Sequence, residues 1–189
     1  MFGPDDVLAF ANTRLDRPGG LVDRLRERED AARWLAEHLH FAPARGLTAD
    51  QHRELLRFRD AARRLIQARS AGTAPPRRER AEVNRASAGA LRAEQLGADW
   101  QASVRFGSTG SERSRDLAEL LAGLAHATIA LVADPTADLA ECAADDCVVL
   151  FLRTDPRRRW HSTRCGNRVR AARSYARHRP AAAPGTSPP

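Results

Sequence analysis

The spacing of apolar residues predicts two amphipathic helices near the start of the chain. Over 21–40, leucines and alanines recur every three or four residues, which gives a helix one buried face. The stretch 49–70 repeats this spacing, and Thr48 followed by Gln51 is the pattern of a capping box. We therefore expect a helical layer packed around one apolar core.

Shorter segments flank these helices. The apolar run 7–13 fits either a short strand or a buried entry segment, and Arg17-Pro18-Gly19-Gly20 signals a turn. After a proline-containing loop over 72–78, the spacing predicts a third helix over about 79–96.

The period then changes from helical to alternating. Apolar and polar residues alternate over 99–106, as in a half-buried strand, and 107–111 reads as a turn. A long apolar helix is predicted over about 112–133, ending before Asp134-Pro135. The expected fold class is mainly α with a small β element (α+β), and residues 1–135 form the first domain.

Charge separates the C-terminal quarter from the rest. The 189 residues carry +7, but residues 151–189 hold ten arginines and one acid, a net +9, which leaves −2 for residues 1–150. Such asymmetry points to a polyanionic partner for the C-terminal end. The plainer alternative is a basic tail that only aids solubility.

Composition suggests a bacterial protein that works in the cytoplasm. Every basic residue apart from histidine is arginine, and alanine is abundant, as in GC-rich bacterial coding. No apolar run is long enough to span a membrane, and the start of the chain lacks signal-peptide features. In that compartment, three cysteines close together in sequence favour a metal site over disulfides.

The motif that carries chemistry is Cys142-x4-Cys147-x13-His161-x3-Cys165. Two close ligand pairs separated by a linker are typical of a structural zinc site. Four protein ligands close the tetrahedron and leave no position for a substrate. The alternative is three buried free thiols and a surface histidine.

The linker and the segment after the last cysteine agree with a small metal-stabilised module. Residues 148–152 read as a strand and 154–156 as a turn, and the run from Gly166 to Arg179 has helical character. The final segment, 180–189, is rich in proline and alanine and is expected to be a disordered tail. A unit this short needs the metal for stability.

The run Trp160-His161-Ser162-Thr163-Arg164-Cys165-Gly166-Asn167-Arg168 resembles the Cys-Gly-Asn-Arg signature of the bacterial CGNR zinc-finger family. The resemblance places a finger over 138–179 that holds one structural Zn²⁺. The family has cysteine where this chain has His161, and histidine is an ordinary zinc ligand.

The upstream residues resemble the ABATE domain that accompanies such fingers. The similar segments are 8–13, Trp34-Leu35 and 117–131. The resemblance implies an ABATE-like helical regulatory domain over 1–135 in a stress-induced transcription regulator.

An arginine-rich surface around the finger is the expected nucleic-acid interface. Three of its arginines precede the second ligand pair and four follow it on the helix, where 170, 173 and 177 share a face. The expected contact residues are Arg157, Arg158, Arg159, Arg168, Arg170, Arg173 and Arg177. The alternative is a solvated basic helix. We expect structural roles, not base contacts, for Trp160, Gly166 and Asn167.

Asn12 and Thr13 are candidates for a ligand-binding or turn role in the first domain. No nucleophile with its base, phosphate-binding glycine loop or carboxylate pair is recognisable, so we do not expect an enzyme. The expected function is DNA-binding transcription regulation, with the first domain sensing an effector or forming a homodimer. The alternatives are an RNA- or protein-interaction module, or an enzyme whose site lies in residues 1–135.

Overall fold

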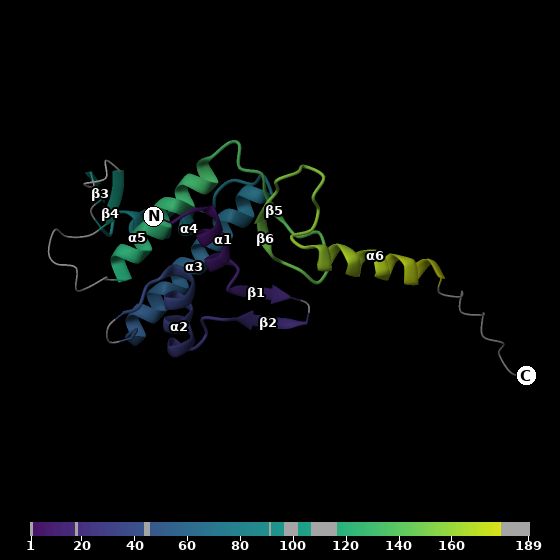
Figure 1. Cartoon of the computed structure of the whole chain (residues 1–189), viewed down its shortest axis with the longest axis horizontal. Helices are drawn as coiled ribbons and strands as arrows, with labels where there is room; N and C mark the ends of the chain where they lie inside the picture. The colour runs from purple at the N-terminus through teal and green to yellow at the C-terminus, as the bar shows by residue number, and fades with distance from the viewer. Residues whose placement is uncertain are drawn as a thin grey trace, which may run out of the picture.

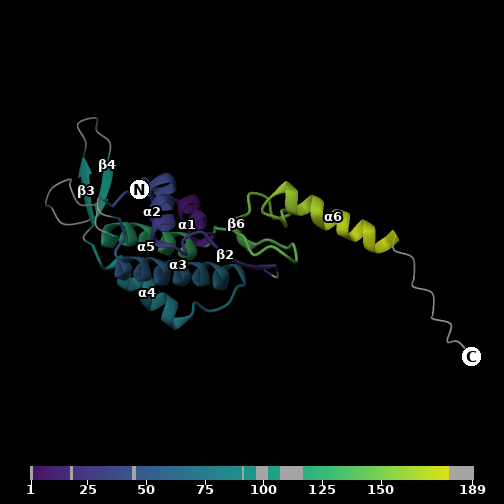
Figure 2. The same cartoon turned by 90° about the horizontal axis from the view of Figure 1, so that it is seen from below.

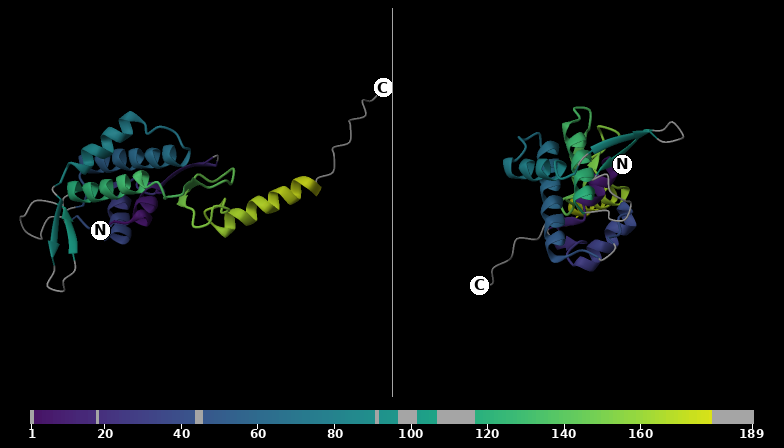
Figure 3. Two further views of the ribbon diagram at one scale, coloured as in Figure 1. Left: turned by 90° about the horizontal axis from the view of Figure 1, so that it is seen from above. Right: turned by 90° about the vertical axis from the view of Figure 1, so that its left-hand side faces the viewer.

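The structure is a helical body from which one helix projects. It is a computed structural model, and the residues that it describes are 2–17, 19–43, 46–90, 92–96, 102–106 and 117–178. Within them lie six helices and three two-stranded antiparallel sheets. Helix α6 extends away from the body in Figure 1, Figure 2 and the left-hand view of Figure 3. The predicted fold class, mainly α with a small β element, is confirmed.

The elements follow one another in a simple order along the chain. The helices are α1 (Pro4–Ala11), α2 (Arg28–Leu39), α3 (Ala49–Ser70), α4 (Arg77–Ser87), α5 (Leu117–Ala133) and α6 (Thr163–His178). The strands are β1 (Arg14–Arg17), β2 (Gly20–Asp23), β3 (Arg92–Leu96), β4 (Ala102–Phe106), β5 (Leu139–Glu141) and β6 (Leu150–Leu152). Each strand pairs with its neighbour in sequence, so every sheet is a hairpin.

Helix α3 lies at the centre of the body, against α4 and α5 (Figure 2). Its predicted bounds are confirmed, and so is its capping box: the Gln51 backbone N–H donates to the Thr48 hydroxyl and the Gln51 side chain accepts from the Thr48 N–H. The main core collects the apolar faces of the first five helices, including Phe10, Trp34 and Phe58. Among the described residues, the members of this cluster lie in helices and in the loops that join them.

The run 7–13 forms most of α1, so a strand was the wrong alternative there. Pro4 occupies the first turn, and the Asp6 carboxylate accepts a hydrogen bond from the Gly3 N–H at 2.8 Å. Val7, Leu8, Phe10 and Ala11 are buried, at the spacing of a helix face. The run is therefore a buried entry segment of helical form.

The predicted helix 21–40 is also wrong over its first third. Residues 14–17 and 20–23 form the β1–β2 hairpin, in which Arg17 pairs with Gly20. Leu21, expected on a buried helix face, is exposed in β2. The helix α2 begins only at Arg28, because residues 20–23 pair with β1 as a strand.

The third predicted helix ends earlier than expected. Helix α4 stops at Ser87, and the Gly89 N–H donates to the Ala86 carbonyl as the chain turns. Residues 92–96 then form β3, which pairs with β4 in the region predicted as a strand. The predicted turn 107–111 and the expected start of the next helix at 112 lie outside the described residues; α5 is described from Leu117.

The C-terminal module contacts the body through the β5–β6 hairpin. Leu139 and Leu150 of this hairpin share a buried cluster with Val7, Ile66 and Leu131 of the body. A second small cluster surrounds the three cysteines and includes Phe151. Strand β5 was missed because three residues are too short for a recognisable alternation. The predicted tail 180–189 lies outside the described residues.

Candidate metal centre and nucleic-acid interface

The first pair of cysteines lies in the loop between β5 and β6. Cys142 follows β5 directly, and its N–H donates to the Val149 carbonyl at 2.9 Å. The Cys147 N–H donates to the Ala144 carbonyl at 2.8 Å, which closes a tight turn between the two thiols. The hairpin therefore presents both sulfur atoms on one side of the loop.

The second pair lies where the return arm meets α6. The Ala143 N–H donates to the Arg159 carbonyl at 2.9 Å, which ties the arm to the first loop. Helix α6 begins at Thr163, two residues ahead of Cys165, so the first turn of the helix carries this thiol beside His161. The predicted helix 166–179 therefore starts earlier, and Arg179 lies outside the described residues.

The four side chains converge on one small volume. Their ligand atoms all lie within 4.8 Å of one another, and the three cysteines are buried and unpaired as disulfides. His161 Nδ1 lies 3.4 Å from Cys147 Sγ and 3.6 Å from Cys165 Sγ. Tetrahedral zinc with bonds of about 2.3 Å to sulfur and about 2.0 Å to nitrogen separates such atoms by about 3.5 Å. The donor set therefore fits one zinc ion with no open coordination position.

Electrostatics explain why this cluster needs a cation. Burial raises the pKa of the Cys147 thiol to about 12, and the neighbouring Cys142 adds to the rise. Burial, followed by the charges of Arg158, Arg17 and Arg168, lowers the pKa of His161. The imidazole is thereby favoured in the neutral form that binds metals, while the Cys147 thiol needs the charge of an ion to bind as a thiolate.

Trp160 and Gly166 pack the start of α6 against the cluster. A Cβ atom at Gly166 would lie 3.1 Å from Cε3 of Trp160, so the indole occupies the space left by the missing side chain. The Arg170 guanidinium lies 5.7 Å from the indole centroid, and its Nη2 donates to the Asn167 side-chain oxygen. Gly166 thus permits a close approach, and Asn167 sits inside the helix instead of capping it.

Two family models match the chain. The ABATE model, described as a putative stress-induced transcription regulator, matches residues 6–135, well over half of the sequence. The chain belongs to the ABATE family. The CGNR zinc-finger model matches residues 139–178, so the finger follows the ABATE domain directly. A comparison with curated proteins finds no match.

The finger match, together with the four converging side chains, supports one structural zinc ion in this chain. These side chains are Cys142, Cys147, His161 and Cys165. A structural site of this kind contributes its binding energy directly to folding.

Three of the expected nucleic-acid contacts are engaged within the CGNR finger, and one of them is Arg170 through Trp160 and Asn167. Arg158 donates to the carbonyls of Trp160 at 3.2 Å and His161 at 2.5 Å and lies over the Phe151 ring. Arg168 forms an ion pair with Asp146. Arg158 and Arg168 brace the arm and the first loop around the metal site.

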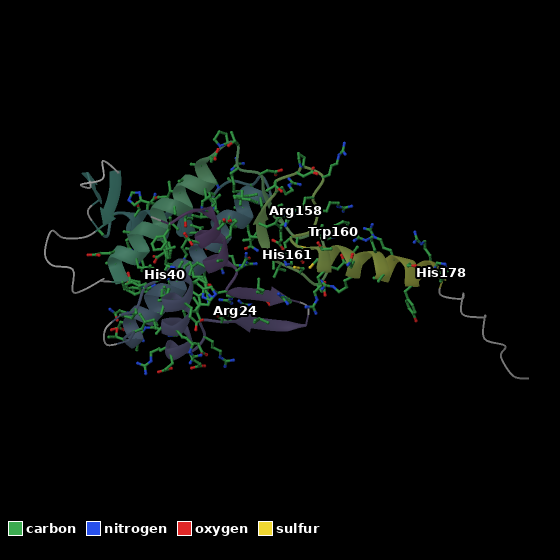
Figure 4. The ribbon with its side chains drawn as sticks, in the orientation of Figure 1. Arg24, His40, Arg158, Trp160, His161 and His178 are labelled. Atoms are coloured by element: carbon green, nitrogen blue, oxygen red, sulfur yellow. The ribbon has the colours of Figure 1, made fainter. Side chains whose placement is uncertain are left out.

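Other arginines of the finger point to solvent. Arg157, Arg159, Arg173 and Arg177 are exposed, and among the described residues their side chains have no ion-pair partner. Figure 4 shows Arg158, Trp160 and His161 together at the base of α6, with His178 at its far end. At about 100° per residue, positions 170, 173 and 177 fall within a narrow arc of α6. The distal part of α6 is therefore a free basic surface.

Asn12 and Thr13 form the turn that ends α1, and Asn12 also holds the finger. The Asn12 amide donates to the Leu150 carbonyl at 2.8 Å and accepts from the Leu150 N–H at 3.0 Å, as a neighbouring strand would. The buried Thr13 hydroxyl donates to the Phe10 carbonyl at 2.7 Å. Asn12 is thus a joint between the ABATE domain and β6.

Arg63 completes this joint, and sequence reasoning missed it. Its guanidinium donates to Ala11 O at 3.3 Å, Asn12 Oδ1 at 3.1 Å and Val148 O at 2.5 Å. The signal in the sequence is an arginine inside the apolar stripe of α3, one turn before Ile66. Among so many arginines, that signal is easy to overlook.

The described residues contain no helix with the length and apolar character needed to cross a lipid bilayer.

Proposed function

We propose that this protein is a bacterial DNA-binding transcription regulator in which the zinc site fixes α6 as the DNA-contacting helix. The observation that carries the proposal is the free basic helix: α6 leaves the body at the metal site, and its distal arginines are exposed (Figure 1). A helix that only covered a core would bury one face, whereas α6 buries only Cys165 and Gly166.

The dimensions of α6 suit a DNA groove. Its 16 residues span about 24 Å at 1.5 Å per residue, and the major groove is about 12 Å wide. Arg170, Arg173 and Arg177 would neutralise phosphates or reach base edges, and Arg157 and Arg159 of the return arm would add backbone contacts. Arg158 and Arg168 would contribute mainly by holding the finger in shape.

The ABATE domain would supply the regulatory input. Its firm joint with the finger through Asn12 and Arg63 means that a change in α1 or α3 would move the finger as well. We assign it the role of sensing an effector or forming a homodimer, in the cytoplasm and without a catalytic step.

Binding to duplex DNA against RNA of the same sequence and length tests the proposal. We expect the zinc-loaded chain to bind DNA more tightly, with an affinity that falls steeply with salt, and to lose binding when a chelator removes the metal. Equal or tighter binding to RNA would favour an RNA-interaction module instead. Absence of binding to either nucleic acid would favour a protein-interaction module.

A further inference from the structure

A polar pocket lies where the ABATE domain meets the finger. Strand β1 contributes Arg14 and Asp16 from one face, and α3 contributes a stripe that includes Asp60 and Arg63. Val148 of the finger closes the pocket, whose volume is about 210 Å³. This is below the roughly 300–1,000 Å³ of sites for drug-sized ligands, so the pocket suits a small molecule.

Most charges around the pocket are already paired. Arg14 Nη1 lies 2.7 Å from Asp60 Oδ2, and Arg59 Nε lies 3.0 Å from Asp60 Oδ1. Arg64 forms an ion pair with Glu79 at 2.8 Å. Arg59 also pairs with Asp23 at 2.6 Å, so three arginines and three carboxylates balance one another around the pocket.

Two opposite charges on the pocket wall remain unpaired. Arg63 is 7% exposed, yet among the described residues no carboxylate oxygen lies within 4.0 Å of it, and Glu141 and Asp60 act on it only from farther away. Asp16 is exposed and likewise forms no ion pair with a described residue. A buried cation without a close counterion is costly, and a ligand carboxylate would remove that cost.

The hydrogen bonds of Arg63 leave one edge of its guanidinium free. Nη1 donates to Ala11 O and Asn12 Oδ1, and Nη2 uses one N–H for Val148 O. The remaining donors among the five are Nε–H and one N–H of Nη2, and these two nitrogen atoms lie on one edge of the guanidinium. That edge matches the two oxygen atoms of a carboxylate.

We propose that this pocket binds a small α-amino acid, whose carboxylate pairs with the free edge of Arg63 and whose ammonium group pairs with Asp16. The arrangement favours a zwitterion over a simple anion, because an anion would face Asp16 with no compensating charge. Binding is measurable without DNA and does not depend on the proposed function. Only the use of the site as a signal rests on that function.

The same guanidinium would carry the signal to the finger. Val148 lies next to the zinc ligand Cys147, and its carbonyl accepts the shortest hydrogen bond of Arg63. A carboxylate bound to the free edge would pull the guanidinium toward the pocket and so weaken its hydrogen bond to the Val148 carbonyl. Ligand binding would therefore change the loop that holds Cys142 and Cys147.

The test is a titration of the zinc-loaded full chain, followed by NMR at the Arg63 Nε–Hε signal, with three probes of matched shape. L-Alanine carries both charges, propionate lacks the ammonium group and ethylammonium lacks the carboxylate. We expect a saturable shift with L-alanine, binding about tenfold weaker with propionate, and none with ethylammonium. The Arg63→Lys variant assigns the signal and should lose L-alanine binding while keeping its zinc.

The second part of the test is the variant Asp16→Asn. Asp16 is exposed and takes no part in the contacts that Asn12 and Arg63 make with the finger. This variant should bind L-alanine and propionate equally. An unmoved Arg63 signal with all three probes would overturn the proposal, and so would equal binding of L-alanine and propionate by the unmodified chain. If L-alanine binds but duplex DNA does not, the ligand site stands and the regulator assignment fails.

Discussion

Replacing Asn12 with alanine should weaken the joint between the ABATE domain and the finger. The Asn12 side chain exchanges two hydrogen bonds with the backbone of Leu150, at 2.8 and 3.0 Å, and accepts a third from Arg63. Leu150 is 1% exposed, so water cannot readily replace the lost partners. Each buried group left unsatisfied costs about 1–3 kcal/mol, and the expected loss in unfolding free energy is about 3 kcal/mol.

Urea denaturation of the zinc-loaded chain, followed by far-ultraviolet circular dichroism and tryptophan fluorescence, measures this loss. With a slope of about 2 kcal/mol per molar urea, the midpoint should fall by about 1.5 M. Asn12→Asp keeps the acceptor but not the donor, and its cost should be about half as large. Asn84→Ala, at an exposed position of α4, is the matched control and should change stability by less than about 0.5 kcal/mol.

The reasoning would be refuted if Asn12→Ala were as harmless as Asn84→Ala. The two probes give a second check. Trp160 lies in the finger and Trp34 in the main core, so coincident transitions in the unmodified chain should separate once the joint is broken. Transitions that stay coincident in the variant would mean that other contacts hold the finger.

Three further predictions concern the metal site and the core. His161→Ala should lower zinc affinity by more than about 100-fold in a chelator competition, since the loss of a residue that only supports a ligand already costs about 10–100-fold. His161→Cys should retain the metal. Zinc should be released as pH falls, because all four ligands must stay unprotonated to bind it. Despite partial burial, hydrogen bonds from Arg59 and the Leu25 N–H lower the pKa of Asp23 below 3.8, so its contribution to stability is present above about pH 4 and is lost as pH falls through the folded pKa. Asp23→Asn should cost about 3 kcal/mol and flatten this acid limb of the stability curve. Gly166→Ala should displace the indole of Trp160 and shift its fluorescence emission, and an unchanged spectrum would contradict the packing.

The sequence was sufficient wherever one local signal dominated. The bounds of α3 follow from its leucine spacing and the Thr48 capping box, and the cluster of three cysteines with His161 follows from cysteine and histidine spacing. It failed where two signals competed. Leucine spacing from Leu21 onward suggested a helix, but the pairing of β1 with β2 determined the structure.

Long-range contacts were beyond local patterns. Asn12 and Leu150 are 138 residues apart, and no spacing in either segment indicates that one side chain pairs with the other backbone. The same holds for Arg63, whose burial depends on the finger closing over α3. Composition likewise counted Arg158 and Arg168 with the free arginines, whereas the structure engages them within the finger.

The central claim is that the exposed arginine face of α6, formed by Arg170, Arg173 and Arg177, is what binds nucleic acid. The most direct test is the salt dependence of duplex DNA affinity, compared between the unmodified chain and the combined variant Arg170→Gln, Arg173→Gln and Arg177→Gln. At about 0.9 per phosphate contact, the slope of log affinity against log salt should fall by about 2.7. The control removes three exposed arginines of α4, Arg77, Arg78 and Arg80, and should leave the slope unchanged. A slope in the α6 variant equal to that of the unmodified chain would contradict the account.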